Sequence, residues 1–288
     1  MKVTRTTGVA LLALAHTSLA LHLGVAPVVR SPRALPYTRR SGAIVCGWGP
    51  EPVWEELMIE TIEDAATSMK SITIVPPPGV AEGYTTPGQY VQIRAPGAEK
   101  AGFFAIASPP GKEGAFEFLI KETPPSEWSP GTGWLTGAEA GTKLEMSQVM
   151  GGGFKIFDTD DDTVLLFAAG SGISPIRSAI EDANEKGLRK RKVQLFYGAQ
   201  TEAQMAYMDK FAEWEALGDF SVTPVLSKPG DGWKGKTGYV QDVAKEMGIV
   251  DSPDNTCILL CGMKGMSEGV KELAAEVGIA EEKVMANF

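Results

Sequence analysis

Histidine and cysteine, the residues most used in imidazole catalysis and in metal sites, are scarce in this sequence. Its two histidines, His16 and His22, both lie within residues 1–50 of the 288-residue chain. If this segment is removed as a leader, the mature protein contains no imidazole. The sequence therefore excludes a Ser/His/Asp triad, histidine acid/base catalysis and histidine metal ligands.

Cysteine is equally scarce, with Cys46, Cys257 and Cys261 as the three in the chain. Cleavage beyond Cys46 would leave two thiols, which are too few to hold a structural zinc ion alone. Cys257 and Cys261 stand four residues apart in an apolar segment with strand character, so their separation is too large for a disulfide. The sequence thus predicts neither a zinc site nor a disulfide.

Acidic residues are absent from the first fifty positions, whereas the rest of the chain has an excess of them. Of 27 basic and 36 acidic residues, six basic ones and no acidic ones lie in residues 1–50, which leaves 21 against 36, a net charge of −15, for the remainder. An acidic body argues against nucleic-acid binding, which needs basic surface to neutralise phosphates. The six basic residues are Lys2, Arg5, Arg30, Arg33, Arg39 and Arg40.

Residues 1–50 have the composition of a targeting leader. Lys2 and Arg5 precede the apolar run "GVALLALAHTSLALHLGVAPVV", which predicts a secretory signal ending near Ala20. The following "VVRSPRALPYTRRSGAIVCG" is rich in arginine and free of acid, as transit peptides are. Such a bipartite leader is typical of algae whose plastid lies inside extra membranes, and it predicts a plastid location. The alternative is a transmembrane anchor, since the run approaches the roughly 20 residues that span a bilayer.

Residues 51–157 contain short segments with β character, separated by clusters of proline and glycine. Such spacing predicts an antiparallel sandwich or barrel. The segments are "MKSITIVPP", "GQYVQIRAP", "GFFAIASPP", "AFEFLIKE" and "TKLEMSQVM".

Residues 158–288 alternate apolar strands with amphipathic helices. This alternation predicts a parallel sheet covered on both faces, so the expected fold class is an antiparallel β domain followed by an α/β nucleotide-binding domain. We expect strands at 163–170, 192–199, 220–227 and 256–263, and helices at 174–187, 203–218, 240–248 and 266–278.

The stretch "LLFAAGSGISPIRSAI" leads from a strand through Gly170 and Gly172 into a helix. Glycines let a backbone approach a pyrophosphate, and Pro175 suits the first helical turn. Ligands of open parallel sheets settle at such strand ends, beside the N–H groups of a helix. Taken alone, a tight turn without a ligand explains the same pattern.

Four segments, each at the end of a strand, follow one another in a recognisable order, and the glycine turn belongs to the first of them. They are "AAGSGISPIRS", "LFYGAQT", "VLSKPGDGWKGKTGYVQD" and "LLCGMKGM". With "FFAIASPP" and the terminal "ANF", they make residues from about 52 to 288 resemble the ferredoxin-NADP reductase superfamily, in a plant and algal branch of fruit-protein-like reductases. The resemblance implies a six-stranded FAD-binding β-barrel at 51–157 and an NADP- or NAD-binding domain at 158–288.

The resemblance also implies residues that bind the nicotinamide dinucleotide. By this resemblance, the turn at Gly170–Pro175 binds the pyrophosphate, and Cys261 lies beside the nicotinamide. Because lysine lacks the bidentate fork of arginine, NADP is favoured over NAD only modestly. A solvated basic loop and a cysteine of the core are the alternatives. The implied residues are Gly170, Gly172, Ser174, Pro175, Gly198, Ser227, Lys228, Lys236, Tyr239, Cys261 and Gly262.

The flavin side departs from the family pattern. Where the family has Arg-x-Tyr-Ser, this chain has Gly102, Phe104 and Ala105. Losing one charged partner costs roughly 1.5 to 3 kcal/mol, or about tenfold to 150-fold in affinity. Phe104 keeps a stacking surface, and Thr132 replaces the phosphate-binding serine. The resemblance implies flavin contacts from Phe104, Ile106, Ala107, Ser108, Thr132 and Gly151, with the backbone groups of Ile106 and Ala107 at the ring edge, and a terminal Phe288 covering the flavin.

These features predict an FAD-containing NAD(P)H oxidoreductase of the plastid, with Cys261 and Phe288 at the reacting rings. Without the family's serine hydroxyl, we expect hydride transfer to be slower than, or altered from, that of photosynthetic ferredoxin reductases. The sequence does not name the electron acceptor, although the acidic body makes an acidic ferredoxin a poor partner by long-range attraction. We also expect a loose association with thylakoid or photosynthetic complexes. The alternative is a non-catalytic, reductase-like protein that has lost its flavin and binds a nucleotide or a photosynthetic complex.

Overall fold

A computed structural model describes residues 51–112, 114–124, 130–155, 159–186, 191–248, 250 and 252–287. They belong to one compact unit, Gly47–Phe288. The predicted leader at 1–50, the predicted domain boundary at 157/158 and the terminal Phe288 lie outside the described residues. Among the described residues, no helix combines the length and the apolar character needed to cross a bilayer.

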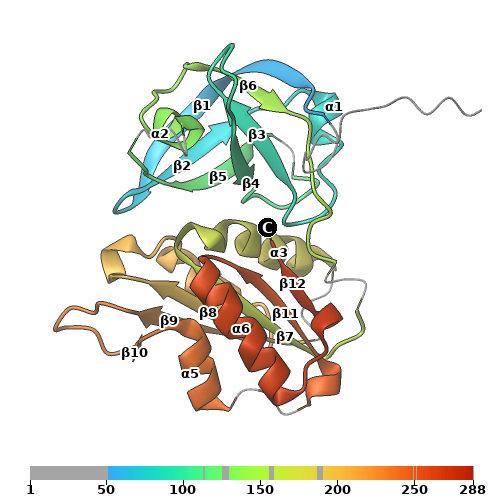
Figure 1. Ribbon diagram of the computed structural model, residues 1–288, viewed down its shortest axis with the longest axis vertical. Helices are drawn as coiled ribbons and strands as arrows, with labels where there is room; N and C mark the ends of the chain where they lie inside the picture. The colour runs from blue at the N-terminus through green and yellow to red at the C-terminus, as the bar shows by residue number, and fades with distance from the viewer. Residues whose placement is uncertain are drawn as a thin grey trace, which may run out of the picture. The chain divides into compact units, whose positions relative to one another are not determined.

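The first half forms an antiparallel sheet with strand order β4-β3-β6-β1-β2-β5 (Figure 1). One cluster of buried side chains draws from all six strands, among them Ile59, Ile93 and Phe118, so the sheet curls around its own core. Its strands are β1 Trp54–Ala66, β2 Met69–Ile74, β3 Tyr90–Arg94, β4 Gly102–Ala105, β5 Phe116–Lys121 and β6 Lys143–Ser147, with short helices α1 Pro78–Ala81 and α2 Pro130–Thr136. We call this half the barrel.

The long strand β1 does not appear among the predicted strands, although it pairs with both β2 and β6. Acidic side chains and two register shifts, at Ile59/Thr61 and at Asp64/Ala66, break its alternation of apolar and polar residues. Because strand prediction depends on a strict period of two, such irregularities hide a strand in the sequence.

The second half is a parallel sheet with strand order β10-β9-β8-β7-β11-β12. Together with the antiparallel first half, it confirms the predicted fold class. The strands are β7 Thr163–Ala169, β8 Lys192–Ala199, β9 Phe220–Leu226, β10 Lys236–Thr237, β11 Thr256–Cys261 and β12 Val284–Ala286, and the helices of four or more residues are α3 Ile173–Lys186, α4 Phe211–Glu215, α5 Val240–Met247 and α6 Lys264–Val277.

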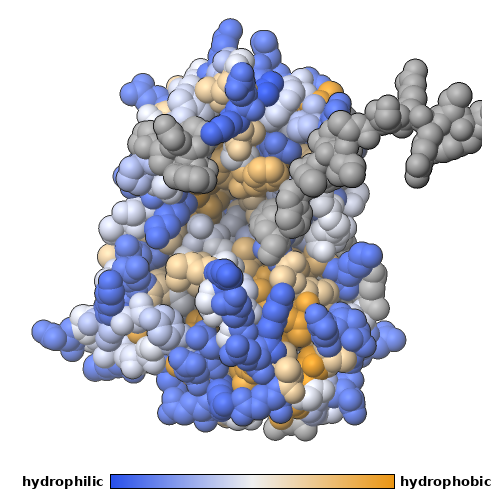
Figure 2. All heavy atoms as spheres, viewed as in Figure 1, coloured by the Kyte–Doolittle hydropathy of each residue, from blue (hydrophilic) through white to orange (hydrophobic). Residues whose placement is uncertain are grey.

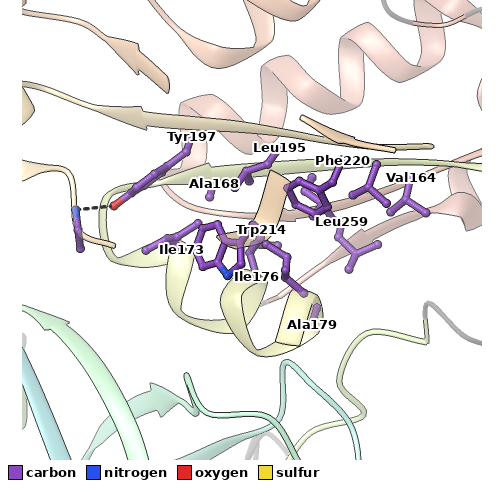
Figure 3. Close-up of a cluster of buried hydrophobic side chains, with 14 of the residues drawn as sticks. Val164, Ala168, Ile173, Ile176, Ala179, Leu195, Tyr197, Trp214, Phe220 and Leu259 are labelled. Atoms are coloured by element: carbon purple, nitrogen blue, oxygen red, sulfur yellow. Dashed lines mark hydrogen bonds between the residues drawn. The ribbon is translucent and has the colours of Figure 1, made fainter. Parts of the chain in front are cut away.

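Helices cover both faces of this sheet, because successive strand side chains point to opposite sides. Leu166 and Ala168 of β7 join the cluster that contains α3 and Trp214 of α4 (Figure 3). Leu165 and Phe167 join the other cluster, which includes buried residues of α5 and α6. The continuous apolar run of β7 is thus explained by burial on both sides.

The strand order reverses at β7, whose neighbours are β8 on one side and β11 on the other. The chain therefore leaves β7 and β11 toward opposite faces, and a crevice opens at their carboxyl ends. Open parallel sheets bind ligands at such a switch point. The turn Gly170–Gly172 follows β7 there, and Gly262 follows β11.

The helix predicted over 203–218 is wrong for most of its length. Two short 3₁₀ turns, Glu202–Gln204 and Met208–Lys210, precede α4, and Tyr207 between them has a left-handed φ of 61°. The Ala206 N–H donates to the Tyr197 hydroxyl at 3.2 Å, a bond drawn in Figure 3. Tertiary contacts thus hold this segment in a non-helical path.

Candidate active site

A cavity of about 830 Å³ lies between the barrel and the carboxyl edge of the parallel sheet, lined by residues of both. This volume falls within the roughly 300–1,000 Å³ of small-molecule and cofactor sites. In Figure 2, the middle of the view is hollowed and bordered by apolar side chains, whereas the outer rim is largely hydrophilic.

Many residues predicted to hold a cofactor meet at this cavity, although they come from distant parts of the chain. Those in its wall are Phe104, Thr132, Gly170, Gly172, Ser174, Pro175, Gly198, Ser227, Tyr239, Cys261 and Gly262. Their contacts with a cofactor stay predictions.

The glycine turn after β7 packs directly on the end of β11. A Cβ atom on Gly172 would lie 2.2 Å from the Cys261 carbonyl oxygen, so only glycine lets the two backbones approach this closely. Gly170 has a φ of +56°, in the region that favours glycine. The turn thus packs one strand end on the other and borders the cavity, and its contact with a pyrophosphate stays a prediction.

Cys261 ends β11 in the cavity wall. Desolvation raises the pKa of its thiol to about 12. The side chain of the neighbouring Asn287 acts in the opposite direction and lowers this pKa. The thiol therefore stays protonated near neutral pH and is no thiolate nucleophile. Its chemistry suits a positioning contact with a flat ring.

Only two of the four residues predicted to bind the adenosine end of the dinucleotide line the cavity. Ser227 and Tyr239 lie in the wall, and Tyr239 is 60% exposed. Lys228 and Lys236 are exposed outside the wall, and the Lys228 ammonium donates to the Gln200 side-chain oxygen at 3.4 Å. Both lysines thus stand beside the Ser227–Tyr239 end of the site.

Three predicted flavin contacts lie inside the barrel and not in the cavity wall. Ile106, Ala107 and Ser108 are at most 1% exposed. The Ile106 N–H donates to the Gln89 carbonyl and the Ala107 N–H to the Glu117 carbonyl. The barrel thus already uses these two N–H groups, and a contact of the other backbone groups of Ile106 and Ala107 with a flavin edge stays a prediction.

Gly151 also lies outside the cavity wall. Its φ is +83°, and a Cβ there would lie 2.8 Å from the ring of Tyr90. We therefore read Gly151 as a turn residue packed on Tyr90.

The aromatic surface on the barrel side has two members. Phe104 is only 7% exposed and joins the barrel core, with its ring packed over Gly102. Phe103, which the sequence analysis did not select, is 52% exposed, lines the cavity and contacts Tyr90 at 5.8 Å between ring centroids. Strand alternation predicts opposite faces for the two rings but not which of them meets a ligand.

Gln241 is a second residue that the sequence analysis missed. It lies in the cavity wall, and its buried Oε1 atom has no hydrogen-bond partner among the described residues. Buried polar atoms are nearly always paired, so this acceptor is available to a ligand. Its position two residues after Tyr239 was the one signal that could have found it.

Side-chain contacts join the barrel to α3 beside the cavity. The Ser174 hydroxyl donates to the Ala105 carbonyl at 3.2 Å. The hydroxyls of Tyr84 and Ser178 lie 2.6 Å apart. These bonds fix the two walls relative to each other.

The wall fits a flavin and a nicotinamide dinucleotide in its chemistry. It offers close backbone at Gly172, aromatic rings at Phe103 and Phe104, the Thr132 side chain and the acceptor of Gln241. Among the described residues, no group of three or more His, Cys, Asp or Glu side chains is placed to hold a metal ion.

Comparison with known proteins agrees with this arrangement. The profile of the oxidoreductase NAD-binding domain matches residues 166–272. Fruit protein pKIWI502 of Actinidia deliciosa is 34% identical over 249 residues, which cover 81% of this chain and 76% of that protein. The chain belongs to the ferredoxin reductase superfamily.

Other members of the superfamily are similar over one part of their length. A component of the Na(+)-translocating NADH-quinone reductase of Pasteurella multocida (strain Pm70) is 28% identical over 194 residues, 63% of this chain and 47% of that component. The chain thus spans about half the length of the quinone-reductase relatives that it matches.

Solved structures of the superfamily share the fold. The cytochrome P450 reductase GcoB of Amycolatopsis has a TM-score of 0.69 at 21% identity, covering 82% of this chain and 70% of that one. A ferredoxin NADP+ reductase from Neisseria gonorrhoeae, with bound FAD and NADP, also has a TM-score of 0.69, at 16% identity and over 82% and 98% of the two chains. Superfamily membership and fold class are both as the sequence predicts.

Proposed function

We propose that this protein is a flavin-dependent NAD(P)H oxidoreductase that transfers hydride between a nicotinamide cofactor and FAD. One observation carries the proposal: the barrel and the carboxyl edge of the parallel sheet together line one cavity, with Phe104 and Thr132 on the first wall and Gly172 and Cys261 on the second. Several relatives and structural neighbours are reductases by name, among them a component of an NADH-quinone reductase and an NADP+ reductase with bound FAD.

The bound flavin supplies the redox chemistry, and the protein supplies position and environment. The turn at Gly170–Gly172 lets a pyrophosphate come close to the backbone. The protonated thiol of Cys261 would contact the nicotinamide ring without forming a bond to it. The buried oxygen of Gln241 would accept a hydrogen bond from the dinucleotide. Orienting two rings in this way is the main route by which a protein accelerates hydride transfer.

NADP is the preferred dinucleotide in this proposal. The exposed Lys228 and Lys236 stand beside Ser227 and Tyr239, where a 2′-phosphate would add negative charge. A single lysine attracts phosphate as a point charge, so discrimination against NAD is moderate.

The proposed location is the plastid, supported by the signal-like and arginine-rich parts of residues 1–50. Loose association with thylakoid or photosynthetic complexes is part of this proposal. Fusing residues 1–50 to a fluorescent protein in an alga with a complex plastid tests the location. Fluorescence confined to the cytosol or to the secretory pathway would overturn it.

The experiment for the activity uses the purified full-length protein. We expect a visible flavin spectrum, equimolar FAD on release, bleaching by NADPH without oxygen, and NADPH-dependent reduction of ferricyanide. Protein that binds no FAD even after its addition, yet is stabilised against heat by NADPH, would be a nucleotide-binding relative without catalysis. That result would overturn the proposed function. The loss of FAD binding would then be explained by Gly102, which stands where the family has an arginine.

A further inference from the structure

Asn287 directly follows β12, the edge strand beside β11 (Figure 1). In the register of these two parallel strands, Leu260 faces Ala286. The Asn287 N–H donates to the Leu260 carbonyl at 3.1 Å, so the ladder continues one residue beyond β12. Asn287 is therefore the neighbour of Cys261, the last residue of β11.

The side chains of Cys261 and Asn287 point to the same face of the sheet. Leu259 of β11 and Met285 of β12 are register partners, and both belong to the cluster that contains α3. Alternate residues of a strand share a face, and neighbouring strands lie only about 4.8 Å apart. Cys261 and Asn287, two residues further along their strands, are therefore adjacent on the α3 face, where Cys261 packs against the same cluster.

The Asn287 amide contacts the Cys261 thiol. Burial raises the pKa of this thiol to about 12, whereas the polar contact with the Asn287 side chain lowers it. A neighbour that lowers the pKa of a thiol stabilises the thiolate, so the amide presents its N–H group to the sulfur. Nδ2 of Asn287 is buried and has no full hydrogen bond among the described residues. Because buried donors are nearly always paired, this sulfur is the acceptor that the structure offers to the amide.

The backbone of Cys261 is fixed by the glycine turn, and its thiol is not. The Cys261 carbonyl lies so close to Gly172 that a Cβ atom there would come within 2.2 Å of the oxygen. The side chain keeps one rotatable bond, χ1, whose staggered rotamers send the sulfur in different directions. The contact with Asn287 favours one of these rotamers.

Asn287 is not among the described residues that line the cavity, whereas Cys261 is. The amide therefore acts on a ligand in the cavity through the thiol. A sulfur that accepts a hydrogen bond from Asn287 directs its own S–H proton away from the amide. This leaves the S–H group available to a ring in the cavity.

We propose that Asn287 is a positioning residue for hydride transfer, because it selects the Cys261 rotamer that presents the thiol to the nicotinamide. This inference rests on the proposed function, since it adds a residue to the same reaction. Small misplacements of reacting groups cost much of an enzyme's rate, so a residue behind the cavity wall can control the rate without touching the ring.

The first test measures the thiol itself and needs no turnover. Full-length protein as purified is treated with iodoacetamide at about pH 10, and mass spectrometry follows the peptides that carry Cys261 and Cys257. The thiolate is the reactive form, so the initial rate reports the ionised fraction of each thiol. Asn287→Leu keeps a similar shape without the amide, and Asn287→Asp places a carboxylate beside the sulfur. Asn255→Leu is the matched control, because the Asn255 amide donates to Asp162 at 2.5 Å, before the start of β11.

We expect Cys261 to react about fivefold more slowly in Asn287→Leu than in the wild type, since its thiolate loses a hydrogen bond. Asn287→Asp should react more slowly still, because a like charge disfavours the thiolate. Cys257 should keep its rate in both variants, and Asn255→Leu should leave the Cys261 rate unchanged. A role in packing alone predicts easier access to the thiol, so an unchanged or faster reaction of Cys261 would overturn the inference.

Cys257 also reports whether a variant is folded. Faster alkylation of both cysteines in Asn287→Leu would mean that this variant unfolds. The nearly isosteric Asn287→Asp would then decide, with slower alkylation of Cys261 supporting the inference and an unchanged or faster rate overturning it.

The second test measures hydride transfer. Bleaching of the bound FAD by NADPH in anaerobic rapid mixing gives the rate constant and the Kd of NADPH. Asn287→Leu should lower the rate constant about fivefold and leave the Kd unchanged. In a Cys261→Ala background, the same substitution should change the rate constant by less than about twofold, since Asn287 acts through the thiol. Equal slowing in both backgrounds would overturn the inference.

The wild-type protein separates this inference from the proposed function. Wild-type protein whose flavin NADPH does not bleach contradicts the proposed function and, with it, a role of Asn287 in hydride transfer. Wild-type protein that is bleached, while Asn287→Leu is bleached at the same rate, contradicts the role of Asn287 alone.

Discussion

The Nη1 atom of Arg177 lies 2.6 Å from Oε2 of Glu117, so one ion pair joins α3 of the nucleotide-binding half to β5 of the barrel. Arg177 also pairs with Glu181 at 2.8 Å, and its guanidinium lies 4.9 Å from the ring centroid of Tyr207. The Arg177 side chain is only 6% exposed. This buried cation holds the two walls of the cavity together.

Replacing Arg177 should destabilise the protein strongly. Arg177→Met leaves Glu117 and Glu181 without their main buried cation, and we expect the free energy of unfolding to fall by about 3 kcal/mol. Urea denaturation measures it. Lys245→Met is the control, because the Lys245–Glu276 pair is more than half exposed and surface pairs contribute little. Equal losses in the two variants would contradict a special role for Arg177.

The same pair predicts a loss of stability in acid. Burial by itself would raise the pKa of Glu117, but the hydrogen-bonded Lys112 and the Arg177 guanidinium outweigh it and hold that pKa below its usual value of about 4.5. The folded state therefore favours the ionised form, and its stabilisation is present above pH 4.5 and lost as the pH falls through the lowered pKa. In thermal melts below pH 4.5, Glu117→Gln should lose less stability per pH unit than the wild type.

The close approach at Gly172 makes this position intolerant of a side chain. In Gly172→Ala the new methyl group would meet the Cys261 carbonyl at 2.2 Å, and the resulting shift should cost about 3 kcal/mol. Gly265→Ala is the matched control, since Gly265 also lines the cavity but a Cβ there meets nothing within 4 Å. In helix α6 it should be neutral or stabilise by up to about 1 kcal/mol. Similar melting temperatures for both variants would contradict the contact.

The two described cysteines should resist alkylation in the folded protein. Burial raises the pKa of the Cys257 thiol to about 11, and desolvation raises that of Cys261 to about 12. At pH 8 both thiols are protonated and react slowly with iodoacetamide, whereas urea-unfolded protein should react fully. Mass spectrometry of the peptides that carry them measures the difference. Because the unfolded thiols ionise near pH 9, these groups also lower stability as the pH rises from about 9 toward 12.

Cofactor preference should depend on the basic loop beside Ser227. Lys228→Ala should raise the KM for NADPH about fivefold and leave the KM for NADH unchanged, since an exposed ammonium contributes up to about 1 kcal/mol. Steady-state reduction of ferricyanide measures both. Lys271→Ala, a change of an exposed lysine on α6, is the control. A parallel rise of both KM values would contradict recognition of the 2′-phosphate.

The α/β half was predictable because its strands are buried on both faces. Expected strands at 163–170, 192–199 and 256–263 overlap β7, β8 and β11, whose runs of buried apolar residues are typical of strands covered on both faces. In the barrel the signal is weaker, and β1 escaped it through its acidic residues and register shifts. The helix expected over 203–218 failed for another reason: contacts with Tyr197 and Arg177 overrode a local helical preference.

The sequence by itself determined the order of the two domains, the glycine turn after β7 and the cysteine at the end of β11, because each is written in adjacent residues. Only the tertiary structure decided which side chains face the cavity. In the tertiary structure, Phe103, Lys121 and Gln241 line the cavity, whereas Ile106 and Ala107 are buried in the barrel. The physical reason is that a strand presents two faces, and which of them borders a cleft depends on how distant segments pack against it.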